Sequence, residues 1–176
     1  WTKIFPGVGL TAGKFRQQFG VVNRWHVHAL DQFEFPLALT TILGEEGLNQ
    51  IGLSFDWTMP SIISNANLLT LQITTGQNEQ LFSGDMFSFP AGLLHLKNYW
   101  DLSRDTYLEL GLTGMLGKNT QRGYDDEGNL ILEDSRLTAL GGLDLTVFWE
   151  PLNQARYHSL LWRTEFYFPN NELLNV

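Results

Sequence analysis

The sequence predicts an all-β chain whose antiparallel strands form part of a transmembrane β-barrel. Three observations lead to this prediction: apolar and polar residues alternate in several segments, many of these segments run for about ten residues, and the links between them sort by length. Successive side chains of a strand point to opposite faces, so alternation gives each strand one apolar and one polar face. A strand that crosses a bilayer needs about 9–11 residues, whereas a mean soluble strand has about 5–6.

Seven segments are expected to be strands, because turn residues bound each of them. In order along the chain they are 7–15, 50–59, 68–75, 94–101, 106–116, 137–149 and 157–168. The first is rich in glycine and loosely patterned, whereas the second has a large apolar residue at every odd position. The third and fourth alternate leucine, isoleucine and tryptophan with threonine, glutamine, histidine, lysine and tyrosine. In the last three, leucine and aromatic residues lie on one face, and acidic residues, threonine and arginine lie on the other.

The links between the expected strands alternate between short and long. The short links are 60–67, 102–105 and 150–156, and the long links are 76–93 and 117–136. In an up-and-down sheet all the short links then lie at one end, as do the short periplasmic turns of outer-membrane barrels. Trp57, Trp100 and Trp149 fall near that end, where amphipathic rings collect at a membrane interface.

Composition excludes several other classes of protein. Charged residues make up 17% of the 176 residues, below the roughly 25% usual in soluble domains, and aromatic residues make up 13%. No run of about 18 apolar residues could span a bilayer as a helix. The net charge of −8 and the absence of a basic stripe exclude nucleic acid as a partner. With no cysteine, disulfides and thiolate metal sites are excluded, and the first ten residues show no signal-peptide pattern.

Three stretches resemble the phosphate-selective-porin-like family of outer-membrane proteins. They are "AGKFRQQFGVVNRWHVHALDQFEFPLALTTILGEEGLNQIGLSFDW" (12–57), "LLHLKNYWDLSRDTYLELGLTGMLGKN" (93–119) and "LLWRTEFYF" (160–168). The resemblance implies an antiparallel barrel of about 16 strands, often trimeric, that passes hydrophilic solutes. Seven strands are too few for such a barrel, so the chain is expected to be part of a larger one or to close with other chains. Phosphate selectivity is not expected, because such a pore lines its constriction with arginine and lysine, and this chain is acidic.

The expected organisation is one partial outer-membrane β-barrel over 1–176, in which 16–49 is a long loop folded into the lumen. This segment has no single period, and long unperiodic loops are often functional. The expected function is porin-like passage of small hydrophilic solutes or ions through a water-filled lumen. The candidate lumen residues are Asp56, Lys97, Asp101, Glu109, Asp144, Arg163 and Glu165. The candidate constriction residues are Arg24, His26, His28, Glu45 and Glu46.

Metal and cofactor sites are not expected. His26 and His28 are weak metal candidates, since only Asp31 or Glu34 could complete the site, and a hydrogen-bonded pair is favoured. The sequence "GEEG" (44–47) is interpreted as a solvated turn rather than as an acidic ring or calcium site. The segment 124–134 lacks the spacing of a calcium loop and is interpreted as an exposed acidic loop.

Other functions remain open at this point. A plugged receptor barrel, a structural outer-membrane anchor for other envelope proteins, and a soluble lipocalin-like ligand-binding barrel are the alternatives. An enzyme is not expected, since no nucleophile elbow, phosphate loop, dinucleotide fingerprint or zinc motif occurs. The expected location is the outer membrane of a Gram-negative-type bacterium. The expected partners are membrane lipid and lipopolysaccharide, small polar solutes, and either a homotrimer or other envelope chains.

Overall fold

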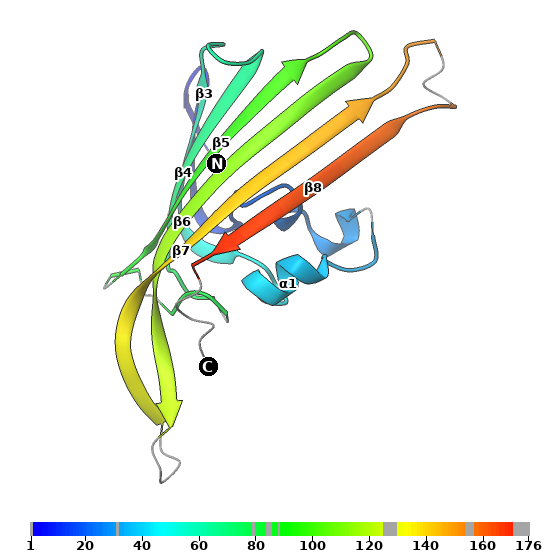
Figure 1. Cartoon of the computed structure of the whole chain (residues 1–176). Coiled ribbons are helices and arrows are strands. Elements are labelled where there is room, and N and C mark those ends of the chain that lie inside the picture. Colours follow the sequence, from blue (N-terminus) through cyan, green and yellow to red (C-terminus); the bar gives the residue numbers. More distant parts are fainter. Residues whose placement is uncertain are drawn as a thin grey trace.

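The computed structural model describes residues 2–30, 32–78, 80–83, 86–87, 89–124, 130–153 and 157–170. These residues form an all-β fold, one open antiparallel sheet in which every strand pairs with its neighbours in sequence (Figure 1). Seven strands are long and one is short: β1 (Thr2–Phe5), β2 (Val8–Arg16), β3 (Asn49–Met59), β4 (Ala66–Thr74), β5 (Ala91–Asp101), β6 (Thr106–Tyr124), β7 (Leu130–Trp149) and β8 (Leu160–Pro169). Within the described residues, β1 and β8 are the two edges.

Among the described residues, the helices lie between β2 and β3. They are the short 3-10 helices η1 (Val22–Arg24) and η2 (Val27–Ala29) and the α-helix α1 (Leu37–Leu43). Helix α1 ends at Gly44, whose φ of 84° lies in the left-handed region that glycine adopts without strain. No helix among the described residues has the length and apolar character needed to cross a membrane.

The seven long strands confirm the seven predicted ones. Most strand ends lie within a few residues of the predicted ends. The short strand β1 was not predicted. The prediction of a long loop at 117–136 is wrong, because β6 and β7 continue through most of it as a paired ribbon, down to Tyr124 opposite Leu130. The segment 124–134 was predicted as an exposed acidic loop, but its described residues, 124 and 130–134, are strand, and 125–129 lie outside the described part of the chain. Figure 1 shows this hairpin reaching beyond the rest of the sheet.

The alternation along the strands sorts side chains onto two opposite faces of the sheet. The polar face carries, among others, Gln50, Ser54, Asp56, Thr70, Gln72, His95, Lys97, Glu109, Asp144, Thr146, Arg163 and Glu165. The apolar face carries, among others, Ile51, Leu53, Trp57, Leu71, Ile73, Leu94, Leu112, Leu116, Leu143, Trp162, Phe166 and Phe168. The predicted strands from 50–59 onward thus have the two faces that their sequence patterns indicate, whereas β2 places Lys14 on the apolar face and Phe15 on the polar face.

Burial on these two faces is inverted relative to a soluble protein. On the polar face, Thr70 is fully buried, and His95 and Asp144 are each only 1% exposed. On the apolar face, Leu53 is 52% exposed and Phe168 is 62% exposed. Soluble domains bury their large apolar side chains and place polar ones in water. The described residues therefore leave many large apolar side chains of this face uncovered.

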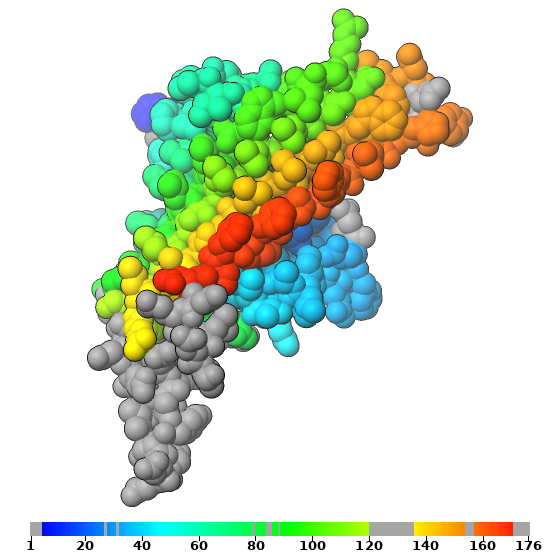
Figure 2. All heavy atoms as spheres, in the orientation of Figure 1, coloured from blue at the N-terminus to red at the C-terminus, as the bar shows by residue number. Residues whose placement is uncertain are grey.

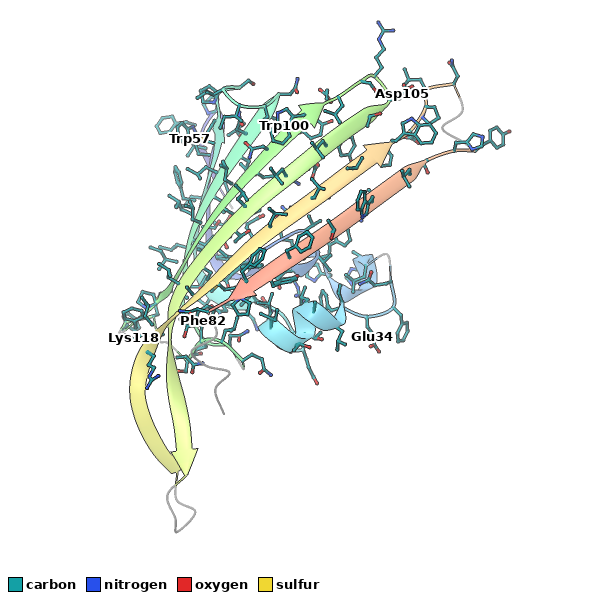
Figure 3. The ribbon with its side chains drawn as sticks, in the orientation of Figure 1. Glu34, Trp57, Phe82, Trp100, Asp105 and Lys118 are labelled. Carbon is teal, nitrogen blue, oxygen red and sulfur yellow. The ribbon has the colours of Figure 1, made fainter. Side chains whose placement is uncertain are left out.

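The tryptophans of the apolar face gather near the short links. Trp57, Trp100 and Trp149 lie at or near the ends of β3, β5 and β7, and the indole Nε1 of Trp100 donates to the Ile63 carbonyl at 3.1 Å. Figure 3 shows Trp57 and Trp100 close to the same end of the sheet as Asp105. Lys118 and Phe82 lie toward the opposite end in the same view. Trp57, Trp100 and Trp149 therefore lie toward the end of the sheet with the short links, and their place at a membrane interface stays a prediction.

A small apolar core lies on the polar face near the end of the sheet with the long links. It joins the segment between β2 and β3 to the link between β4 and β5, and its members are Phe19, Leu39, Leu43, Leu48, Leu81, Phe82, Ala91, Leu93, Met115 and Leu140. Phe82 occupies the space above Gly117, where any side chain would collide with its ring. Both long links are therefore fixed to the sheet by packing as well as by hydrogen bonds.

Candidate functional site

The residues between β2 and β3, here called the inserted segment (17–48), cover part of the polar face. Its first residues bind strand β4: Gln17 Nε2 donates to Thr74 Oγ1 at 3.1 Å, and the Gln18 amide donates to Gln72 Oε1 at 3.0 Å. Phe19 then stacks on Tyr167 of β8, with ring centroids 5.6 Å apart. The segment therefore crosses the polar face from β4 to β8.

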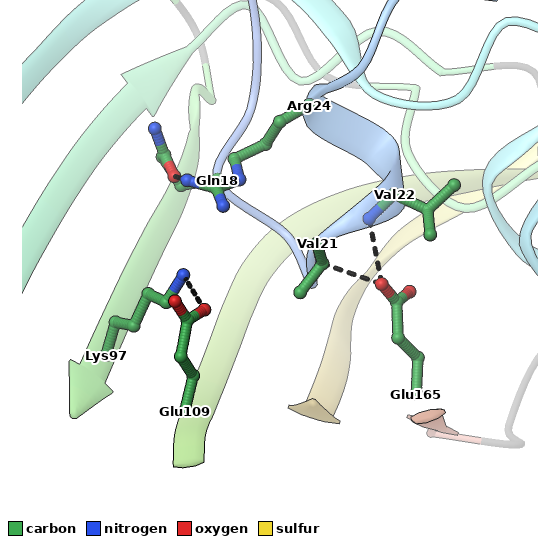
Figure 4. Close-up of polar contacts among 7 residues, drawn as sticks. All are labelled: Gln18, Val21, Val22, Arg24, Lys97, Glu109 and Glu165. Carbon is green, nitrogen blue, oxygen red and sulfur yellow. Dashed lines mark hydrogen bonds and ion pairs between the residues drawn. The ribbon is translucent and has the colours of Figure 1, made fainter. Parts of the chain in front are cut away.

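Glu165 fixes the inserted segment at the β8 side. Its Oε1 accepts hydrogen bonds from the backbone amides of Val21 at 2.7 Å and Val22 at 2.8 Å (Figure 4). Its Oε2 accepts a hydrogen bond from the Tyr167 hydroxyl. Hydrogen bonds to a carboxylate are shorter and stronger than those between neutral groups. One carboxylate thus satisfies two backbone donors at the start of η1, which has no side-chain cap of its own.

Asn23 joins the two ends of the inserted segment. Its Nδ2 donates to the Gln17 carbonyl at 2.9 Å and to the Leu48 carbonyl at 3.3 Å, and its Oδ1 accepts from the Leu48 amide at 2.8 Å. The side chain is 0% exposed. These hydrogen bonds hold the two ends of the inserted segment, Gln17 and Leu48, next to each other.

We expect replacement of Asn23 by alanine to lower the free energy of unfolding by about 2–4 kcal/mol, because the buried Leu48 amide loses its acceptor and the Gln17 and Leu48 carbonyls each lose one of two hydrogen bonds. Urea unfolding of the folded protein measures this loss. The matched variant Asn153→Ala, at an exposed position in the link after β7, should change the same quantity by less than about 0.5 kcal/mol. Equal effects of the two variants would contradict this role for Asn23.

A charged cluster lies beside the inserted segment on the polar face. Lys97 Nζ of β5 forms an ion pair with Glu109 Oε2 of β6, and both side chains are about one-fifth exposed, at 19% and 21% (Figure 4). Arg24 Nη1 donates to Gln18 Oε1 at 2.8 Å. Asp144 lies within electrostatic range of Arg24, Lys97, Glu109 and Glu165. The cluster therefore brings four of the predicted lumen residues together with one predicted constriction residue.

Asp144 and Arg163 lie in the same part of the polar face, each against a different neighbour. The Asp144 carboxylate lies across Gly111, where any side chain would collide with it, and its Oδ2 is buried without a hydrogen-bond partner among the described residues. The Arg163 guanidinium lies over the Trp25 ring, 4.5 Å from the ring centroid. The formal charges of the cluster itself balance, with Arg24, Lys97 and Arg163 against Glu109, Asp144 and Glu165.

The remaining predicted lumen residues lie away from this cluster. Asp56 is on the polar face of β3, where its Oδ1 accepts from the Thr70 hydroxyl at 2.7 Å. Asp101 is exposed at the end of β5, and its backbone amide donates to Asn65 Oδ1 at 3.0 Å. The two residues therefore lie at separate positions along the same face.

The other predicted constriction residues are exposed on the inserted segment. His26 and His28 flank the start of η2, not a strand, and their rings stack with centroids 5.5 Å apart. Among the described residues, no group of three or more acidic or histidine side chains could hold a metal ion, and Asp31 lies outside those residues. Glu45 and Glu46 form the turn after α1, where the Glu46 carbonyl accepts from Arg16 Nη1 at 2.9 Å.

Sequence reasoning missed the neutral polar residues of the site. Gln17 and Asn23 are fully buried, and His95 is 1% exposed with its Nδ1 2.8 Å from Thr113 Oγ1. The alternation of β5 placed His95 on the polar face with Lys97, so a signal existed for that residue. Gln17 and Asn23 lie in a segment without a period, and no pattern in the sequence pointed to them.

Comparisons with known proteins give little that bears on function. No protein-family model and no solved structure matches the chain. The chain is similar to an uncharacterized protein of Aquifex aeolicus (strain VF5), with 34% identity over 82 residues. The matched region covers 47% of this chain and 17% of that protein, so the chain spans a small part of its relative's length.

Proposed function

We propose that this chain is part of a porin-like outer-membrane β-barrel, in which small hydrophilic solutes or ions pass along the polar face. The observation that carries the proposal is the inverted burial of the sheet, with polar side chains enclosed and large apolar side chains open. Lipid tails provide the surrounding that the apolar face requires, and a water-filled lumen suits the polar face. A lipocalin-like barrel would instead turn its apolar face inward, but here the inserted segment covers the polar face.

The edge at β8 supports a larger barrel. Helix α1 extends past β8 in Figure 1, and the space-filling view places the inserted segment directly beside this strand (Figure 2). A cavity of about 350 Å³ separates the two, lined by Trp25 and Pro36 on one side and Leu161 and Glu165 on the other. Leu37 of the same segment is 80% exposed. A further antiparallel strand beside β8 would cover this cavity and satisfy the free edge of the strand.

The inserted segment supports a narrowed lumen. It is fixed to β4 through Gln17 and Gln18 and to β8 through Glu165. The inserted segment lies at the end of the sheet that carries the long links. If the short links face the periplasm, this end faces outward. Lys97 and Glu109 of the charged cluster stay partly exposed beside the segment, with 19% and 21% of their side chains open.

Planar-bilayer conductance of the full-length, detergent-extracted protein under a salt gradient tests the proposal. Stable open channels with weak ion preference are expected, because the charges of the cluster balance. A folded, membrane-inserted barrel without conductance would overturn the proposal and favour a plugged receptor or a structural anchor. A folded protein that stays in water without detergent would favour the soluble ligand-binding barrel.

Charge replacement at Lys97 should change ion preference in a known direction. We expect Lys97→Gln to raise the permeability ratio of cations over anions by roughly twofold, because removal of one cation leaves Glu109 and Asp144 in excess. The reversal potential under a salt gradient measures this ratio. The matched variant Arg104→Gln, at an exposed position in the link between β5 and β6, should leave the ratio unchanged. A shift of equal size in both variants would argue against Lys97 as a lumen residue.

A further inference from the structure

The polar face carries a group of aromatic rings that the charged cluster does not account for. This aromatic strip consists of Tyr99, Tyr107 and Phe148, from the neighbouring strands β5, β6 and β7. The ring centroids of Tyr99 and Tyr107 lie 5.2 Å apart, as do those of Tyr107 and Phe148, and the ring planes are tilted by 34° and 31°. The register places Leu161 of β8 opposite Phe148, which extends the strip to a fourth strand.

The strip lies outside the apolar core of the inserted segment. None of its three rings belongs to that core, which lies toward the opposite end of the sheet. All three rings are half-buried, and Leu161 is 41% exposed. Ring surface of this kind is unfavourable in contact with water. A solute that covers the rings would remove this cost.

Polar groups lie in the next rows of the same face. Glu109 is opposite Tyr99 in the register, Thr146 is opposite Glu109, and Arg163 is opposite Thr146. Binding sites for small molecules combine aromatic surface with a few polar groups that fix orientation. Here carboxylate, hydroxyl and guanidinium groups border one side of the strip, and the Asp101 carboxylate lies opposite Tyr107 at its other end.

We propose that the aromatic strip and its polar border bind neutral oligosaccharides. A sugar ring has an apolar face of C–H groups, which packs on an aromatic ring, and hydroxyl groups at its edge, which hydrogen-bond to charged side chains. Neighbouring rings of the strip are close enough for one extended chain of sugar rings to touch more than one of them. The inference names the solute class of the proposed pore and rests on that proposal for access to the polar face.

Isothermal titration calorimetry of the full-length, detergent-folded protein with maltohexaose tests the inference. Saturable binding is expected, and the open-chain polyol sorbitol should not compete, because it has hydroxyl groups without a ring face. Tyr107→Leu and Phe148→Leu should each raise the dissociation constant by up to about tenfold, the range of one aromatic contact. Tyr107→Phe keeps the ring and should bind with nearly the affinity of the unchanged protein.

The matched control is Phe166→Leu, the same replacement of a half-exposed ring on the apolar face, which should leave the dissociation constant unchanged. Absence of saturable binding, equal competition by sorbitol, or equal effects of Phe148→Leu and Phe166→Leu would overturn the inference. Conductance is measured separately on the same preparation. Channels without maltohexaose binding would contradict the oligosaccharide site and agree with the proposed pore. Binding without channels would contradict the proposed pore and agree with the site.

Discussion

Replacement of Leu112 by arginine should destabilise the protein in a lipid bilayer by about 2–4 kcal/mol, the cost of a cation at the middle of the lipid-facing side of a barrel. Leu112 lies in the middle of the apolar face of β6, opposite Leu96 and Leu143 in the register. It is 45% exposed, so the same change in water should cost no more than about 0.5 kcal/mol. The size of the effect therefore reports directly on what surrounds the apolar face.

Leu102→Arg is the matched control, because Leu102 is 59% exposed in the short link after β5, outside the apolar band. Urea unfolding in liposomes and the heat-dependent shift of the folded protein on a gel measure both variants. Leu112→Arg should fold poorly into liposomes, and Leu102→Arg should fold as the unchanged protein does. Comparable folding of the two variants would contradict a lipid-facing role for this face.

The second large effect is expected at Glu165. Glu165→Ala removes the acceptor of two backbone hydrogen bonds, each worth about 1.5–3 kcal/mol when one partner is charged. The start of the inserted segment should then detach from β8, and hydrogen exchange of the Val21 and Val22 amides should accelerate by about 100-fold. In the proposed pore, single-channel conductance should rise because the segment no longer narrows the lumen.

Two variants separate this effect from a general loss of charge. Glu165→Gln keeps an acceptor oxygen and should give a smaller acceleration of exchange. Glu109→Ala removes a carboxylate from the same face, but Glu109 binds Lys97 rather than the inserted segment, so the Val21 and Val22 amides should exchange as before. Equal acceleration in Glu165→Ala and Glu109→Ala would show that Glu165 has no specific role in fixing the segment.

The strands and their faces could be predicted because alternation is a local property of the sequence. Every odd position of 51–59 is apolar, and the structure places those side chains on one face. The ribbon formed by 117–124 and 130–136 escaped prediction because the charged and turn-forming residues of 117–136 are typical of a loop. Only the pairing of β6 with β7 makes it strand, and that pairing is not visible in either segment alone.

The charged residues of the polar face were predicted individually, but their partners were not. Lys97 and Glu109 were both assigned to this face by alternation, whereas their ion pair depends on the register of β5 against β6. The bond between Glu165 and the Val22 amide joins groups 143 residues apart and uses a backbone donor. Because every residue except proline carries such a donor, nothing in the sequence singles out Val22.

β6 and β7, whose outer parts form the ribbon, are longer than a strand needs to be to cross a bilayer. β6 has 19 residues and β7 has 20, so each continues well past the length that about 9–11 residues need to cross a bilayer. With the long links facing outward, the ribbon would stand above the lipid headgroups at the cell surface. In the proposed outer-membrane barrel, an antibody, a bacteriophage or a neighbouring cell could then reach the ribbon without crossing the membrane.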